Sequence, residues 1–186
     1  VNKVNAKITV RKGYNFHKGY IFILDINKSW WNKEKKSSIE KITINLYSTF
    51  TDASSYSNPL IEAVTAKNNV IKINGLSLCF YNCSALKYVP VLNGENNTIS
   101  TVWAAFYNTA ITKLNVKNFK FEFGNDFLNE CTQLTEWPKG IDYSTATNMR
   151  NFLVDNTKIK DVIVDISGAT GLKTGSTSLA LYNLSA

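Results

Sequence analysis

The chain has 186 residues, which suits one compact domain or a short array of repeats behind a distinct leading segment. Its hydrophobic content of 44% excludes a disordered chain, and the sequence contains no run of about 18 apolar residues that could span a bilayer. The net charge of +7 favours encounter with anionic partners without fixing a fold, and the low charged fraction of 19% leaves room for Asn, Ser and Thr, which favour short elements and tight turns.

Residues 1–57 are predicted to form a small β-rich leading segment. Apolar residues alternate over residues 4–10 and run densely over residues 20–26, and both patterns are typical of strands. Two glycines between these runs favour a hairpin or an early pair of strands. A further strand is predicted over residues 39–46, where apolar residues again alternate with polar ones.

A basic stretch interleaved with tryptophan occupies residues 28–36. One interpretation is a binding patch, because lysines neutralise anions and indole faces stack on bases or sugar rings. The other is a solvated turn whose tryptophans cover the end of the core. The turn is favoured, since neither a set of arginines nor a recognised nucleic-acid motif accompanies the lysines. The residues of the candidate patch are Trp30, Trp31, Lys33, Lys35 and Lys36.

A polar connection leads into the second predicted region, residues 58–186. Residues 47–69 are expected to form a loop with one helical turn around the apolar cluster that begins at Leu60. Residues 70–73 are rich in β-branched side chains, so a strand is expected there. The regular repeats begin directly after this strand.

From residue 80 to residue 164 one short pattern, called a rung here, recurs four times. Each rung has a small polar lead residue, followed by two apolar residues at intervals of three. The lead residues lie about 23–25 residues apart, inside the window of roughly 20–29 residues expected for leucine-rich repeats. These positions are predicted to form a structural repeat core: Cys83, Leu86, Val89, Asn108, Ile111, Leu114, Cys131, Leu134, Trp137, Asn156, Ile159 and Val162.

An apolar pair at helical spacing precedes each rung, such as Leu76 with Phe80 and Val102 with Phe106. Spacings of three and four put such pairs on one helical face, so each unit is predicted to contain one short helical turn and one short strand. Stacked units would bury the apolar sides of both in one continuous core. The predicted fold is therefore α/β and β-rich: a leucine-rich-repeat solenoid with short helical turns, preceded by the β-rich leading segment.

A second match supports this register, because the pattern Asp-x-Ser-x-Ala-Thr at residues 142–147 recurs at residues 165–170. Residues 181–186 also echo residues 80–85, so the chain is expected to stop inside a unit. The array is therefore expected to be incomplete at its C-terminal end, where further chain or another chain would cover the open core.

The rungs at residues 82–86 (Asn-Cys-Ser-Ala-Leu) and 130–134 (Glu-Cys-Thr-Gln-Leu) resemble the BspA-type leucine-rich repeat family. The pattern Asp-x-Ser-x-Ala-Thr-x-Met is similar to the variant of that family found in bacterial surface lipoproteins and some phage structural proteins. The resemblance covers about residues 70–186. It implies a non-enzymatic surface or interaction role, with binding on the exposed strand face or the edge loops, and it transfers no catalytic residue.

The residues themselves give no pattern of catalysis or metal binding. His17 is the only histidine, so a Ser/His/Asp or Cys/His arrangement cannot be built from the repeats. The cysteines form an odd set without a Cys-x-x-Cys pair, so they are interpreted as buried fillers rather than zinc ligands. We predict no catalytic residue, no metal and no cofactor, and a solvated role for the scattered carboxylates, including Asp126, Glu130 and Glu136.

The predicted function is a non-enzymatic attachment or binding module on a cell or virion surface that recognises protein or glycan. The alternative is a structural component of a bacteriophage virion or another large assembly, such as a tail, fibre or capsid-associated protein, held by contacts with further copies or other chains. The expected location is extracellular or at the cell surface, or alternatively in the virion. Nucleic acid is not favoured as a partner, and no membrane span is predicted.

Overall fold

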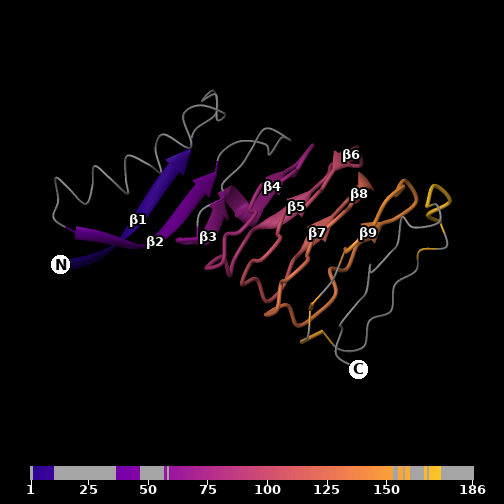
Figure 1. Cartoon of the computed structure of the whole chain (residues 1–186). Coiled ribbons are helices and arrows are strands. Elements are labelled where there is room, and N and C mark those ends of the chain that lie inside the picture. Colours follow the sequence, from indigo (N-terminus) through magenta and orange to yellow (C-terminus); the bar gives the residue numbers. More distant parts are fainter. Residues whose placement is uncertain are drawn as a thin grey trace.

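A computed structural model describes residues 2–10, 37–46, 57, 59–152, 155, 156, 158, 159, 166 and 168–172. Within these residues the protein is strand-rich, and within each sheet the strands follow one another in chain order (Figure 1). The strands are β1 (Asn2–Val10), β2 (Ser37–Leu46), β3 (Ile61–Ala66), β4 (Val70–Lys72), β5 (Val91–Asn93), β6 (Thr98–Thr101), β7 (Val116–Lys117), β8 (Phe119–Phe123) and β9 (Ile141–Asp142).

The described strands pair in three parallel sheets, ordered β1-β2-β3, β4-β5-β7 and β6-β8-β9. In the second sheet Val70 pairs with Val91, and in the third Ile99 pairs with Phe121. Parallel strands cannot be joined by a tight hairpin, so after each strand the chain must cross back before it forms the next strand beside the previous one. We call each such stretch of chain a pass. Short strands therefore recur at similar intervals along the sequence.

Three further stretches, residues 76–82, 102–108 and 124–130, lie side by side without forming named strands. We call them the turn segments. The backbone N–H of Leu78 donates to the carbonyl of Trp103 at 2.8 Å, and that of Ala104 donates to the carbonyl of Asn125 at 2.9 Å. The third segment continues the series, because the N–H of Asp126 donates to the carbonyl of Arg150 at 2.9 Å. Successive turn segments are therefore joined by backbone hydrogen bonds in the same parallel sense as the strands.

The predicted α/β leucine-rich-repeat solenoid with short helical turns is wrong. In the described part of the chain the only helix is the three-residue 3-10 helix η2 (Lys67–Asn69), and Asn68 breaks it with a φ of 57°. The structure is instead a strand-rich fold of small parallel sheets. No helix among the described residues is long and apolar enough to cross a membrane.

The apolar pairs at helical spacing belong to consecutive turns rather than to a helix. The N–H of Cys79 donates to the carbonyl of Leu76 at 3.0 Å, and the N–H of Cys83 donates to the carbonyl of Phe80 at 3.1 Å. The third residue of the first turn, Leu78, has a φ of 52°. A positive φ at this position is typical of a type II turn and is incompatible with an α-helix. The segment therefore bends at every fourth residue and never winds into a helix.

The strands predicted over residues 4–10, 39–46 and 70–73 are present as β1, β2 and β4. The helical turn expected around Leu60 is wrong, because β3 occupies this cluster and pairs in parallel with β2. Among the described residues β1 pairs in parallel with β2, and the hairpin or early strand pair expected between residues 4–10 and 20–26 stays a prediction. The strand predicted over residues 20–26 lies outside the described residues.

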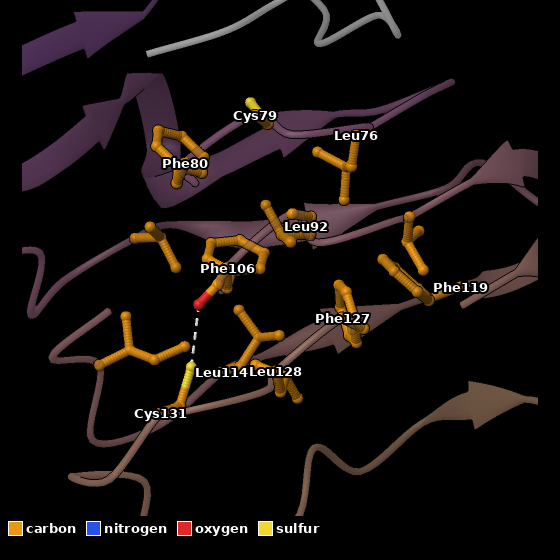
Figure 2. Close-up of a cluster of buried hydrophobic side chains, with 14 of the residues drawn as sticks. Leu76, Cys79, Phe80, Leu92, Phe106, Leu114, Phe119, Phe127, Leu128 and Cys131 are labelled. Carbon is orange, nitrogen blue, oxygen red and sulfur yellow. Dashed lines mark hydrogen bonds between the residues drawn. The ribbon is translucent and has the colours of Figure 1, made fainter. Parts of the chain in front are cut away.

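Aromatic rings from successive turn segments fill the core. The rings of Phe80 and Phe106 stack with centroids 5.3 Å apart, and Phe106 meets Phe127 edge-on at 5.8 Å. Phe127 continues the column to Phe152 at 5.2 Å, and all four side chains are fully buried. Figure 2 shows Phe80, Phe106 and Phe127 in this core. Such ring pairs add roughly 0.5–1.5 kcal/mol each to the stabilisation from burial. The core therefore runs along the stack and ties each pass to the next.

Candidate binding face

The candidate patch in the leading segment, Trp30, Trp31, Lys33, Lys35 and Lys36, lies outside the described residues, and so do His17 and Val162. Within the described residues, the structure buries these predicted repeat-core residues: Cys83, Leu86, Val89, Ile111, Leu114, Cys131, Leu134, Asn156 and Ile159. Trp137 is half-buried, and its indole N–H donates to the hydroxyl of Tyr143 at 3.0 Å. Asn108 is half-exposed.

Asn108 lies one position away from the lead position assigned to it. The N–H of Asn82 donates to the carbonyl of Tyr107 at 3.0 Å, which aligns Asn108 with Asn82 and Thr109 with Cys83. The tripeptide Phe-Tyr-Asn occurs at residues 80–82 and again at 106–108, and this repeat in the sequence marks the same alignment.

The lead positions carry buried polar groups that bridge neighbouring passes. The thiol of Cys131 donates to the carbonyl of Phe106 at 2.9 Å, and the amide of Asn156 donates to the carbonyl of Leu128 at 2.9 Å (Figure 2 shows the first bond). Burial raises the pKa of Cys131 to about 11, although hydrogen bonding with Thr109 opposes the shift. This thiol therefore stays protonated and acts as a donor within the core rather than as a nucleophile.

The outer side of the turn segments gathers aromatic, amide and carboxylate side chains. We call this surface the turn face. Trp103 is its most prominent aromatic residue, with 47% of its surface exposed. The remaining members are half-buried, apart from the buried Asn129: Tyr81, Asn82, Tyr107, Asn108, Asp126, Asn129, Glu130 and Asn151.

The tyrosines of the turn face are held in fixed positions. The rings of Tyr81 and Tyr107 stack with centroids 5.0 Å apart and an interplanar angle of 21°. The hydroxyl of Tyr107 donates to a carboxylate oxygen of Glu130 on the next pass. This hydrogen bond, followed by burial and the charge of Glu130, raises the pKa of Tyr107 to about 12.

Amide side chains continue the network along the stack. The amide of Asn108 donates to the side-chain carbonyl of Asn82 at 3.0 Å. The carboxylate oxygen Oδ1 of Asp126 accepts from the amides of Asn129 at 3.0 Å and Asn151 at 3.1 Å. Each pass is thus linked to the next by side chains as well as by backbone, so the turn face is a preorganised surface.

A second exposed aromatic residue borders the turn face. Phe123, at the end of β8, is 44% exposed, and its carbonyl accepts from the N–H of Val102 at 2.8 Å. Trp103 follows Val102 directly, so two exposed aromatic side chains come from neighbouring passes. Large apolar residues exposed together are more informative than single ones, because they commonly mark contact surfaces.

Hydrogen bonding and burial shift the pKa of several ionisable groups outside the turn face. Glu136 lies 2.6 Å from the ammonium of Lys113, and this hydrogen bond lowers its pKa. Burial raises the pKa of Cys79, and the neighbouring Cys83 raises it further. No group of three or more His, Cys, Asp or Glu residues that could hold a metal ion occurs in the part of the chain that the structure describes.

Comparisons place the chain in no family. No protein-family model, curated protein or solved structure matches it. The resemblance to BspA-type repeats therefore stays a prediction, and the turn face must be judged by its own chemistry. Sequence reasoning did not select Trp103 or Tyr107, and it assigned Glu130 only a solvated role, although the repeated Phe-Tyr-Asn tripeptide points to Tyr107.

Proposed function

We propose that the chain is a non-enzymatic attachment or binding module on a cell or virion surface, which recognises protein or glycan through its turn face. The observation that carries the proposal is the half-exposed indole of Trp103 on a surface of fixed tyrosines and amides. Tryptophan and tyrosine combine a large apolar area with a polar group, and they are enriched among the residues that dominate binding energy.

The rigidity of the turn face supports this role. The backbone of Trp103 is hydrogen-bonded on both sides: its carbonyl accepts from the N–H of Leu78 on the neighbouring pass, and its N–H donates to the hydroxyl of Thr101 on its own pass at 3.1 Å. A backbone held in this way loses little conformational freedom when a partner binds the side chain that it carries. Preorganisation of this kind increases affinity without adding contacts.

The state of the carboxylates supports a non-enzymatic role. Glu130 accepts from Tyr107, and Asp126 accepts from two amides. A general acid or base must exchange its proton with a substrate that it contacts directly. These carboxylates instead serve as acceptors that fix their neighbours.

The test is a binding screen of the intact chain against whole cells and a glycan array, repeated with Trp103→Ala. Loss of the indole should weaken saturable binding by about tenfold or more. Tyr88→Ala is the matched control, because Tyr88 is equally exposed at 47% but lies beside β3, away from the turn segments. Equal losses in both variants, or no saturable binding by the parent chain, would contradict the proposal.

Solution mass separates attachment from self-assembly. A chain that binds its target as a monomer supports an attachment module. If instead the chain forms large homo-oligomers whose formation Trp103→Ala abolishes, the turn face is an assembly contact and the alternative structural role replaces the proposal.

A further inference from the structure

A polar pocket lies at the corner where the second and third sheets meet, at a different place from the turn face. Its volume is about 300 Å³, at the lower end of the range of roughly 300–1,000 Å³ for small-molecule sites. A ligand of one ring-sized unit therefore matches its size. The pocket is lined by Asn96, Asn118, Phe119, Lys120, Gly140 and Asp142.

The corner is built by residues in left-handed backbone conformations. Asn96 and Asn118 have φ values of 65° and 47°, and Gly140 has a φ of 88°. Gly94 brings two passes close together, since a Cβ at this position would lie 2.3 Å from the carbonyl oxygen of Asn118. The amide of Asn118 also donates to the side-chain carbonyl of Asn93 at 3.3 Å. The fold thus places two amide side chains at the pocket on a close-packed corner.

Lys120 and Asp142 bring opposite charges to the wall of the pocket. They are direct partners in the parallel pairing of β8 with β9. Among the described residues Lys120 forms no ion pair within 4.0 Å, so its ammonium keeps donors for a ligand. The carboxylate of Asp142 accepts from the N–H of Ser144 at 2.9 Å. Hydrogen bonding with Ser144, with a smaller contribution from Lys120, lowers the pKa of Asp142, so the carboxylate is an acceptor at neutral pH.

The chemistry of the lining selects a class of ligand. The ammonium of Lys120 and the carboxylate of Asp142 cancel in charge. A simple anion would therefore be repelled by Asp142, and a simple cation would be repelled by Lys120. Phe119 is almost fully buried and offers little apolar surface. The two amides add both donors and acceptors. Hydroxyl groups also donate and accept, so a neutral, polyhydroxylated ring matches this lining better than an apolar or singly charged molecule does.

We propose that this pocket binds one neutral sugar unit of a glycan, with Lys120 donating to and Asp142 accepting from neighbouring hydroxyls, and with Asn96 and Asn118 contacting the opposite edge of the ring. This inference rests on the proposed attachment function and names glycan as its target. The turn face then contributes a separate contact surface, and the pocket supplies selectivity for the sugar.

The experiment measures binding of the intact chain by isothermal titration and saturation-transfer NMR. The probes are neutral hexoses, N-acetylhexosamines and short oligosaccharides of each, with a uronic acid and a free amino acid as charged competitors. Lys120→Met and Asp142→Asn should each weaken sugar binding by about tenfold or more, because each removes a charged hydrogen-bonding group. Lys117→Met is the control, since Lys117 is exposed on β7 outside the pocket lining, and it should leave the affinity unchanged.

The outcomes separate this inference from the proposed function. If Lys120→Met and Asp142→Asn leave sugar binding unchanged, the pocket is not the sugar-binding site. If the amino acid or the uronic acid binds more tightly than the neutral sugars, the ligand is not a neutral sugar. Cell binding that depends on Trp103 without any sugar binding would also overturn the inference, while the attachment function would stand. Thermal unfolding of each variant must match that of the parent chain. Asn118→Gly provides an independent pocket variant if either charged variant unfolds, because it removes the amide and glycine adopts the positive φ of this position readily.

Discussion

The strands and the turn segments stack through the same kind of backbone hydrogen bond, but they make different demands on the sequence. Strand β8 buries Phe119 and Phe121 and turns Lys120 outward, which is the alternation that a pleated strand requires. The turn segments instead place a residue with positive φ at every fourth position, as at Leu78 and Asn82. The strands are therefore specified by alternation, and the turn segments by backbone conformation.

This difference explains why the turn segments resemble helices in sequence. Consecutive i→i+3 turns bring apolar residues to the core at intervals of three and four, as a helix does. Asparagine tolerates a positive φ comparatively well, but leucine and alanine do not. Leu78 and Ala104 nevertheless adopt φ values of 52° and 46°. Packing between passes must outweigh this local strain, because residues held in such regions persist only where the surroundings fix them.

The largest expected effect tests the packing of the turn segments. Phe106→Ala should lower the free energy of unfolding by about 3–5 kcal/mol, because Phe106 is fully buried between the rings of Phe80 and Phe127. Urea denaturation of both proteins measures the change. Phe123→Ala, at an exposed strand end, is the control and should change stability by only about 0.5 kcal/mol. Equal losses in the two variants would show that the turn segments do not hold the core.

Strands β1, β2 and β4 could be predicted from the sequence, whereas β3 and the turn segments could not. Apolar and polar residues alternate over residues 39–46, which indicates a strand with one apolar and one polar face, and β2 lies there. The cluster from Leu60 to Val64 was misassigned, because its apolar spacing fits one turn of helix as well as the inward positions of β3. Spacing does not report the sign of φ, so it could not distinguish a helix from a row of turns.

The candidate site depended on register, which the sequence specified only to within one residue. The rung pattern assigned Asn108 to the lead position, whereas the backbone aligns Thr109 with Cys83 and Cys131. Only the correct register brings Tyr107 over Tyr81 and beside Glu130. The pocket at Lys120 and Asp142 could not be predicted from the sequence either, because these residues come together only through the pairing of β8 with β9.

A smaller effect tests the backbone strain that distinguishes the two regions. Ala104 and Ala105 are neighbours and both are buried, but only Ala104 has a positive φ. Ala105→Gly should lower the free energy of unfolding by about 1–2 kcal/mol, through added chain entropy and a lost methyl contact. Ala104→Gly loses a similar contact but relieves the strain, so it should be nearly neutral.

The measurement for this pair is thermal and urea unfolding of both glycine variants under one set of conditions. The difference between them should be about 1 kcal/mol or more in favour of Ala104→Gly. Equal destabilisation would mean that the backbone at Ala104 is not strained, and that the turn segments are closer to ordinary strands than the φ values indicate.

The smallest effect concerns the surface of the turn segments and depends on pH. Tyr107→Phe keeps the ring stacked on Tyr81 but removes the hydroxyl that donates to Glu130, so stability at pH 7 should fall by about 0.5–1.5 kcal/mol. The pKa of Tyr107 rises from 10.0 to about 12 in the folded chain, so the unfolded chain releases this proton first. Between these two pH values the folded state therefore loses stability as pH rises. Urea unfolding at pH 7, 10 and 11 should show this decline in the parent chain and a shallower one in Tyr107→Phe. Glu130→Gln should flatten it too, since it removes the charged acceptor; an unchanged slope in both variants would mean that the contact between Tyr107 and Glu130 does not hold in solution.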